Sequence, residues 1–142
     1  MIDQSNKKDY QGPLYAPWHK VVVGKQMNNL KMKHILFTLK GCDTFLLNDE
    51  LIVKNLIINA AEICSSKLLA INSHKFEPQG VTCLAMLAES HISIHTWPEK
   101  GMAVCDVFTC GAHTEPEKAV EYMRLALEAK DIIVNEFVRP LE

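Results

Sequence analysis

The residues best suited to chemistry gather in one segment of the chain, Glu89–Gly111. It reads ESHISIHTWPEKGMAVCDVFTCG and holds a serine flanked by an acid and a histidine, a second histidine and two cysteines. Such residues serve as nucleophiles, acid–base groups and metal ligands. Pairing Cys105 or Cys110 with His95 would give a reasonable nucleophile and base, but no local signature singles the pair out.

A zinc site is the first alternative, and its geometry is unfavourable. Four residues of a β-strand span roughly 13 Å, whereas a zinc ion lies about 2 Å from each ligand. His91 and His95 could therefore share one ion only if the strand between them broke. The cysteines also lack the two-residue spacing of paired zinc ligands. We expect no metal.

Three short motifs in this segment are more specific. The sequence has ESH at Glu89–His91, IHTWPE at Ile94–Glu99 and DVFTCG at Asp106–Gly111. In these motifs the chain resembles the S-adenosylmethionine decarboxylase family of bacteria and archaea. A looser likeness runs over residues 33–138, and the residues before it lie outside the resemblance.

The resemblance implies an inactive precursor that cuts itself between Glu89 and Ser90. The Ser90 hydroxyl would attack the Glu89 carbonyl in an N-to-O acyl shift, and β-elimination would then release residues 1–89. The second chain, residues 90–142, would begin with a pyruvoyl group made from Ser90. That group is the only cofactor implied, with neither a metal nor pyridoxal phosphate.

Further matches to the family concern proton transfer. His95 matches the processing histidine, which would polarise the carbonyl or take the α-proton of Ser90. Thr82 occupies the place of a processing serine and keeps the hydroxyl. In turnover the pyruvoyl ketone would form a Schiff base with the substrate amine and withdraw electrons from the breaking bond to carboxylate. Cys110 matches the proton donor to the resulting carbanion.

The implied reaction is that of a carboxy-lyase: decarboxylation of S-adenosylmethionine to the aminopropyl donor for spermidine and other polyamines. Phe76 and Trp97 could offer ring faces to the adenine or the sulfonium, and Glu99 could bind the ribose hydroxyls. The family usually carries an acidic residue on its first strand where this chain has Thr38. Pyruvoyl-dependent decarboxylation of arginine or ornithine is therefore the alternative. A binding domain that never cleaves itself is an alternative of another class.

Spacing adds a constraint on the processing site. Ser90 and His95 in one straight strand would lie roughly 17 Å apart, so they could not touch within one chain. Either the chain reverses sharply between them, or residues 92–96 reach the serine of a second subunit. The second arrangement would make the dimer obligate.

The elements that must carry these residues are short strands and two helices. Apolar runs bounded by turn residues predict six strands, at residues 31–39, 68–76, 81–88, 91–97, 102–110 and 132–138. Apolar residues recur at three- and four-residue steps from Ile52 to Cys64, behind a cap at Asn48 or Asp49, which predicts a helix. A capping-box pattern over residues 114–117 predicts a second helix.

In the strand that carries both histidines, polar and apolar residues alternate. Ile92 and Ile94 point to one side, whereas His91, Ser93 and His95 point to the other. The two sides of this strand thus differ in chemistry.

The order of elements predicts an α+β fold, a two-layer sandwich in which two helices cover one face of a mainly antiparallel sheet. Residues 81–85 and 104–108 are apolar enough that the other face should also be buried. A second copy of the chain, packed sheet to sheet in a homodimer, would bury it.

Composition sets the outer bounds. With 142 residues, 48% of them hydrophobic, we expect one domain at residues 33–142 and a partly ordered N-terminal extension at residues 1–32. A formal charge of -2 gives no basic patch for nucleic acid. Without a signal-like segment or an apolar run of membrane-spanning length, we expect a cytoplasmic protein with no membrane partner. The five cysteines are an odd number without the close spacing of a disulfide framework, so we expect reduced thiols. Four of them are expected to serve in packing: Cys42, Cys64, Cys83 and Cys105.

Overall fold

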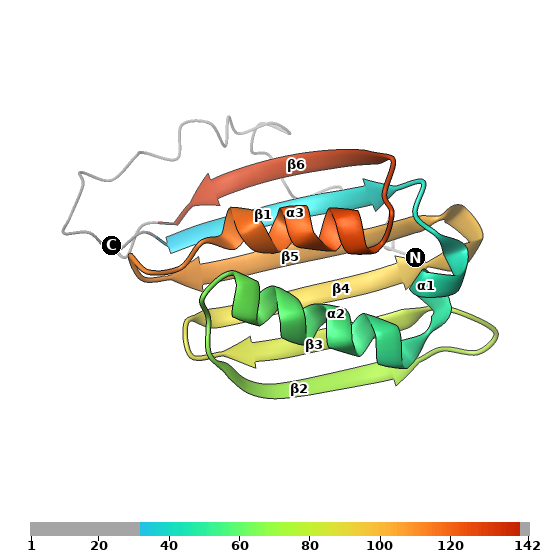
Figure 1. Ribbon diagram of the computed structural model, residues 1–142, viewed down its shortest axis with the longest axis horizontal. Helices are drawn as coiled ribbons and strands as arrows, with labels where there is room; N and C mark the ends of the chain where they lie inside the picture. Colours follow the sequence, from blue (N-terminus) through green and yellow to red (C-terminus); the bar gives the residue numbers. More distant parts are fainter. Residues whose placement is uncertain (1–31, 140–142) are drawn as a thin grey trace, which may run out of the picture.

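The computed structural model describes residues 32–139. Its six strands form one antiparallel sheet in the order β2-β3-β4-β5-β1-β6 (Figure 1). The sheet confirms the predicted α+β class and all six predicted strands. The extension predicted at residues 1–32 lies outside the described residues, except for the residue that begins β1. The strands are β1 (Met32–Lys40), β2 (Leu68–Lys75), β3 (Val81–Leu87), β4 (Ser90–Trp97), β5 (Met102–Cys110) and β6 (Asp131–Val138).

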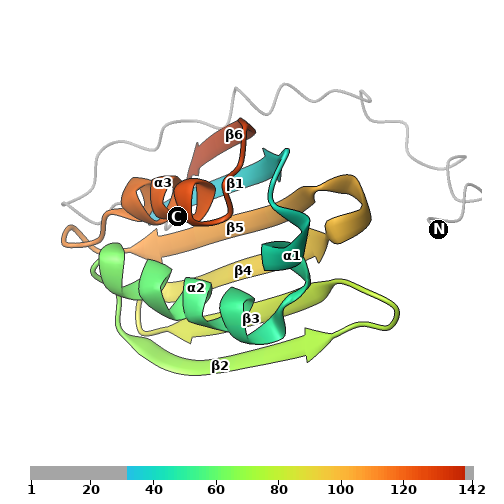
Figure 2. The ribbon, with the colours of Figure 1, turned by 45° about the vertical axis from the view of Figure 1, so that its right-hand side comes forward.

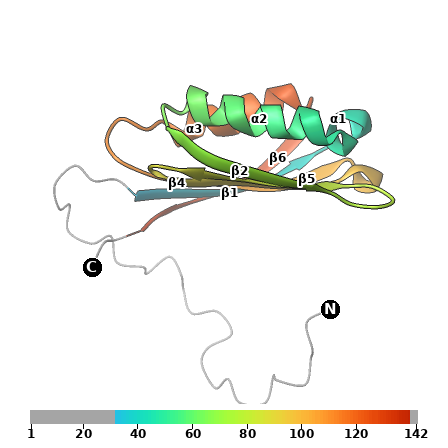
Figure 3. The ribbon, with the colours of Figure 1, turned by 90° about the horizontal axis from the view of Figure 1, so that it is seen from below.

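Helices cover one face of this sheet (Figure 3). The two predicted helices are α2 (Glu50–Ile63) and α3 (Pro116–Ala126), and the short helix α1 (Thr44–Asn48) was not predicted. A 3-10 turn, η3 (Pro98–Lys100), joins β4 to β5. Figure 2 shows α2 over the half of the sheet formed by β2, β3 and β4, and α3 over β5 and β1. None of the helices in the described part of the chain is long and apolar enough to cross a membrane.

The core lies between the helices and every second residue of the strands. α2 begins after Asp49, whose carboxylate accepts the Ile52 N–H, and its apolar residues at three- and four-residue steps face the sheet. The strands contribute side chains that pack against the helices and are at most 3% exposed, among them Ile35, Phe37, Cys83, Ala85, Ile92, Ile94, Cys105 and Val107. Burial of side chains of this kind contributes about 1.5–3 kcal/mol for each large one. This layer is what fixes the register of the strands.

The opposite face of the sheet carries no helix within residues 32–139 (Figure 3). On β3 it is Leu84 and Met86 that point this way, because Val81, Cys83 and Ala85 point to the helices. We call this side the uncovered face. Six of its large apolar side chains are 37–60% exposed: Leu36, Leu84, Met86, Val104, Ile133 and Phe137. Such a surface is typical of an interface, and the predicted homodimer stays a prediction.

Candidate active site

Ser90 begins β4, directly after a two-residue turn from β3. Its neighbours across the sheet are Leu87 and Thr109. The backbone φ of Ser90 is +146°, a value that residues other than glycine rarely adopt. Such a conformation costs about 1–3 kcal/mol and is found mostly at functional sites. The strain therefore lies next to the peptide bond that the sequence predicts will break.

The carbonyl of that peptide bond points at a hydrogen-bond donor. The Cys110 N–H donates to the Glu89 carbonyl oxygen over 3.0 Å. A backbone N–H on a carbonyl oxygen is the arrangement that stabilises an oxyanion when the carbonyl is attacked. The same contact places Cys110, the last residue of β5, beside the Glu89–Ser90 bond. Three of the predicted residues are thus brought together.

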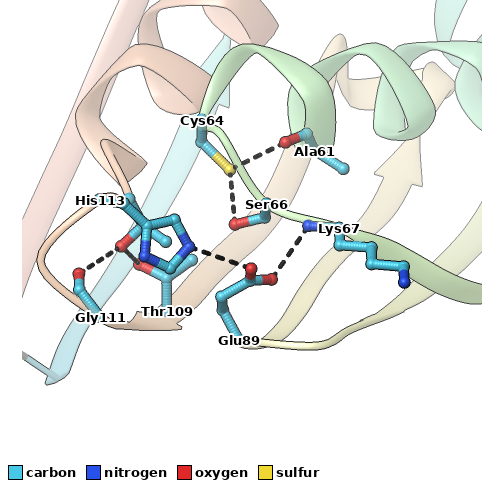
Figure 4. Close-up of polar contacts among 9 residues, drawn as sticks. Ala61, Cys64, Ser66, Lys67, Glu89, Thr109, Gly111 and His113 are labelled. Carbon is cyan, nitrogen blue, oxygen red and sulfur yellow. Dashed lines mark hydrogen bonds and ion pairs between the residues drawn. The ribbon is translucent and has the colours of Figure 1, made fainter.

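The Glu89 side chain is tied down on both of its oxygens (Figure 4). One oxygen accepts the Lys67 N–H over 3.0 Å, and the other lies 3.1 Å from Nε2 of His113. Burial favours the neutral acid, but these hydrogen bonds outweigh it and lower the pKa of Glu89 below its ordinary value. An ionised, anchored side chain limits the movement of the carbonyl behind it.

His95 and Thr82, each predicted to support processing, lie next to each other. Thr82 Oγ1 lies 2.9 Å from His95 Nδ1, and the two residues face each other across β3 and β4. However, β4 runs unbroken from Ser90 to Trp97, so the chain does not reverse between Ser90 and His95. The first of the two predicted arrangements is therefore excluded. The second, in which His95 serves a partner subunit, stays a prediction.

A polar cluster on the uncovered face was missed. Asp106 lies in β5, and its Oδ2 is 2.7 Å from Nε2 of His34 and 2.6 Å from Nε2 of His91. The Ser93 hydroxyl donates to its other oxygen. Burial favours the neutral acid, but the bonds from Ser93, His34 and His91 outweigh it and lower the pKa of Asp106. Nδ1 of His91 lies 3.5 Å from Ser90 Oγ, which connects the cluster to the cleavage site.

The potential ligand atoms of His34, His91 and Asp106 all lie within 4.8 Å of one another. They are the one such set among residues 32–139 that could hold a metal ion. Both histidines, however, direct Nε2 at the same carboxylate oxygen, which hydrogen bonding explains fully. We therefore assign the cluster as a hydrogen-bond network.

Asp106 was the signal that could have revealed this cluster. It is the only charged residue within the apolar strand segment AVCDVF. A half-buried carboxylate needs partners, and the alternation of β4 had already placed His91 and Ser93 together on one face. What the sequence could not supply was the pairing of β1 with β5, which brings His34 to the same carboxylate.

The predicted substrate-binding residues lie at the other end of β4. Trp97 ends that strand, and Phe76 lies in the loop after β2, its ring 4.6 Å from that of His74. Glu99 belongs to η3 and lines a shallow cavity of about 550 Å³. Within one chain, none of these three residues lies beside Ser90.

A second cavity, of about 350 Å³, opens on the uncovered face. Its polar lining includes Thr38, Ser93, His95, Asp106 and Asn135. Asp106 is the only carboxylate in this lining. Thr38, which stands where the resembled family carries an acid, thus faces this cavity.

The five cysteines differ in their burial, and the four predicted to serve in packing are the buried ones. Four are buried, and burial raises the pKa of each of these thiols, to about 11 for Cys42 and Cys83. Cys110 is the exception, because it is partly exposed at the end of β5. A thiol that water and substrate can reach is the one suited to proton transfer.

Comparisons with known proteins agree with this picture. Residues 33–140 match the model of the family described as S-adenosylmethionine decarboxylase. The chain is 51% identical over 107 residues to the S-adenosylmethionine decarboxylase proenzyme of Synechococcus sp. (strain WH7803), covering 75% of this chain and 84% of that one. It is 47% identical over 107 residues to the proenzyme of Methanococcus vannielii, covering 75% and 88%. The crystal structure of the adenosylmethionine decarboxylase from Aquifex aeolicus VF5 matches with a TM-score of 0.73 at 32% identity, over 79% of this chain and 92% of that chain.

Fold and site define a class of protein: an α+β sandwich in which strand ends bring a strained serine, the preceding carbonyl and a reachable thiol together. The comparisons then specify it. The chain belongs to the S-adenosylmethionine decarboxylase family, which confirms the resemblance seen in the sequence.

Proposed function

We propose that this chain is the precursor of a pyruvoyl-dependent decarboxylase that acts on S-adenosylmethionine and cuts itself between Glu89 and Ser90. One observation carries the proposal: the Cys110 N–H lies 3.0 Å from the Glu89 carbonyl oxygen, next to the strained backbone of Ser90. It joins a polarised carbonyl, a nucleophilic hydroxyl and a thiol at one point. The names of the relatives support the substrate, since they are S-adenosylmethionine decarboxylase proenzymes.

Cleavage begins with the acyl shift. The Ser90 Oγ bonds to the Glu89 carbonyl carbon, and the C–N bond between the two residues breaks. Negative charge on the carbonyl oxygen is stabilised by the Cys110 N–H. Breaking the peptide bond also frees the φ of Ser90, so the strain stored there offsets part of the cost of turning an amide into an ester.

The second step is β-elimination. A base takes the α-proton of Ser90, the Cβ–Oγ bond breaks, and the Glu89 carboxylate leaves with residues 1–89. Water then hydrolyses the dehydroalanine left at position 90, releasing ammonia and leaving a ketone at the start of residues 90–142.

The surroundings of Ser90 fit a pyruvoyl group, because the group would stand at the start of β4 with the Cys110 thiol on the adjacent strand. When formed, it supplies the electron-withdrawing carbonyl that decarboxylation requires. Cys110 holds the proton that takes the place of the lost carboxylate on the substrate carbon.

We propose further that the active form is a homodimer with its sheets packed face to face. The exposed apolar side chains of the uncovered face support this packing. The unbroken β4 supports a shared site, in which Thr82 and His95 of one subunit serve Ser90 of the other. By the same geometry, the far end of β4 and its surroundings would supply the substrate-binding residues Phe76, Trp97 and Glu99.

Denaturing electrophoresis tests the cleavage. The wild-type chain should give two fragments of 89 and 53 residues, or about 10 and 6 kDa of the 16.0 kDa total. Ser90→Ala should give one uncleaved band and no decarboxylation. An uncleaved wild-type chain would contradict the proposal and favour a binding domain that does not process itself.

Release of labelled carbon dioxide tests the substrate. We expect release from S-adenosylmethionine and none from arginine or ornithine supplied in parallel. Activity on either amino acid alone would overturn the substrate while leaving the cleavage chemistry standing.

A further inference from the structure

A serine, a histidine and an aspartate are aligned at the cleavage site within a single chain. Ser90 Oγ lies 3.5 Å from His91 Nδ1, and His91 Nε2 lies 2.6 Å from Asp106 Oδ2. Resting on the proposed self-cleavage, we propose that His91 is the base that takes the Ser90 hydroxyl proton in the acyl shift, and that Asp106 is its positioning residue. Neither role was assigned by the sequence motifs.

The hydrogen bonds of Asp106 decide which nitrogen of His91 is free. An ionised carboxylate only accepts hydrogen bonds, and the lowered pKa of Asp106 keeps it ionised. His91 must then carry its hydrogen on Nε2. In the neutral ring Nδ1 is left with a lone pair, and this is the atom that faces Ser90 Oγ. Nucleophile, base and orienting acid thus stand in the order that activates a serine elsewhere.

The ring of His91 is held in this orientation from several sides. Asp106 is fixed by donors on two neighbouring strands, Ser93 on β4 and His34 on β1. The Phe108 ring lies 5.7 Å from the ring of His91 and 5.0 Å from that of His34. With 42% of its side chain exposed, His91 remains accessible to the reacting atoms. The distance of 3.5 Å is one that tightens as the hydroxyl moves toward the carbonyl.

The proton balance of the step is simple. His91 Nδ1 takes the hydroxyl proton as Ser90 Oγ bonds to the Glu89 carbonyl carbon. The negative charge that forms on the Glu89 carbonyl oxygen is stabilised by the hydrogen bond from the Cys110 N–H. When the C–N bond breaks, the imidazolium of His91 returns its proton to the leaving nitrogen of Ser90. The products are an ester and an amine, with His91 neutral again.

The two histidines of the HISIH segment then serve different steps. His91 lies next to the Ser90 hydroxyl of its own chain. His95 is paired with Thr82 and lies five residues from Ser90 along the unbroken strand β4. We therefore assign the acyl shift to His91 and leave the later removal of the α-proton to His95 of a second subunit. A variant of either residue should stop the reaction at a different species.

The experiment follows precursor made by cell-free synthesis, with fragments separated by denaturing electrophoresis. His91→Gln keeps a donor for Asp106 but has no base, so cleavage should slow by about 100-fold. His34→Ala is the matched comparison, because it also removes one bond to Asp106 Oδ2 but touches no reacting atom. Since Ser93 still holds Asp106, His34→Ala should slow cleavage at least tenfold less than His91→Gln does. His91→Ala should likewise be slow, and added imidazole should restore part of its rate.

Hydroxylamine, which cleaves esters, identifies the species at which each variant stops. His91→Gln should accumulate intact amide that hydroxylamine does not cut, whereas His95→Ala should accumulate an ester that it cuts after Glu89. Asp106→Asn should slow cleavage at least tenfold without rescue by imidazole, because the His91 ring still fills its place.

Two results would overturn this assignment. One is a folded His91→Gln precursor that cleaves at the wild-type rate, and the other is equal slowing by His91→Gln and His34→Ala, which would make the network structural. A wild-type chain that never cleaves would instead refute the proposed function itself, so the two failures are distinguishable. Cleavage should also be unchanged by a metal chelator, and inhibition by one would point to a cation in the cluster.

Discussion

The two faces of one sheet use the same strands for opposite purposes. On the helix-covered face, alternate residues of β3, β4 and β5 are apolar and buried, and the thiols of Cys83 and Cys105 are held in their neutral form by burial. On the uncovered face the intervening residues include His91 of β4, which is hydrogen-bonded to Asp106 of β5, and His95 of β4, which is paired with Thr82. Neighbouring residues of one strand therefore differ in chemistry. Those that point to the helices are buried and stabilise the sheet, whereas those that point to the uncovered face can take part in reactions.

Replacing one cysteine on each side gives the largest expected contrast. Cys110→Ala should leave self-cleavage intact and lower turnover by about 100-fold or more, because the proton donor is lost. Cys83→Ala removes the same atoms from a thiol whose pKa is raised to about 11 by burial. It should keep turnover within about twofold and cost about 1 kcal/mol in free energy of unfolding. Cleavage is measured by electrophoresis and turnover by carbon dioxide release; equal losses of turnover would erase the distinction.

Two isoleucines, one on each face, should contribute differently to the free energy of unfolding. Ile94 is fully buried beneath the helices, whereas Ile133 on the uncovered face is 48% exposed. Ile94→Ala should lower the free energy of unfolding by about 3 kcal/mol, through lost burial and a cavity. At protein concentrations where the chain is monomeric, Ile133→Ala should lower it by less than about 1 kcal/mol, because this side chain is half exposed in the single chain. Urea unfolding of uncleaved Ser90→Ala protein measures both, and similar costs would show that both faces are packed equally tightly.

Two leucines test what the uncovered face is for. Leu84 on β3 and Leu125 on α3 are 50% and 59% exposed. Leu84→Asp should weaken the proposed dimer at least tenfold, because it buries an unpaired charge at the interface. Leu125→Asp on the helix layer should leave it unchanged. Sedimentation across a range of protein concentrations checks both, and a dimer that tolerates Leu84→Asp would have to use another surface.

Much of this fold could be predicted because its signals are local. The apolar steps from Ile52 to Cys64 predicted α2 within two residues at each end, and alternation correctly divided the residues of β4 between the faces. The short helix α1 was missed because five residues carry too little periodicity. It depends instead on Asp43, whose carboxylate accepts the N–H groups of two α1 residues.

The predicted capping box before α3 is absent, because its threonine is engaged by residues outside the helix. The Thr114 hydroxyl lies 3.1 Å from both Thr109 Oγ1 and the Gly111 carbonyl oxygen, so it does not cap the helix. The helix starts at Pro116 without a side-chain cap, and Glu117 pairs with Lys33 of β1. A pattern of four residues cannot reveal that its hydroxyl is engaged by another strand.

Local patterns likewise revealed only part of the candidate site, because they do not show which strands pair. Ser90, Cys110 and the pair of Thr82 and His95 could be found from the motifs. In the network around Asp106, the partners on β4 could have been inferred from the lone carboxylate, but His34 could not, because its place depends on the pairing of β1 with β5.

The smallest expected effect concerns acid. In the folded chain the pKa of Asp106 is lowered from an ordinary value of 3.8, because hydrogen bonds from Ser93, His34 and His91 outweigh its burial. A lowered folded pKa gives stability that is fully present above about pH 4 and is lost as the pH falls through the lowered value. Asp106→Asn, made in the Ser90→Ala precursor, should therefore cost about 1 kcal/mol at pH 7, and this cost should shrink below pH 4. Urea unfolding at several pH values measures the difference, with the exposed Asp131→Asn as the control; a cost that stays constant into acid would mean that the charge of Asp106 does not stabilise the uncovered face.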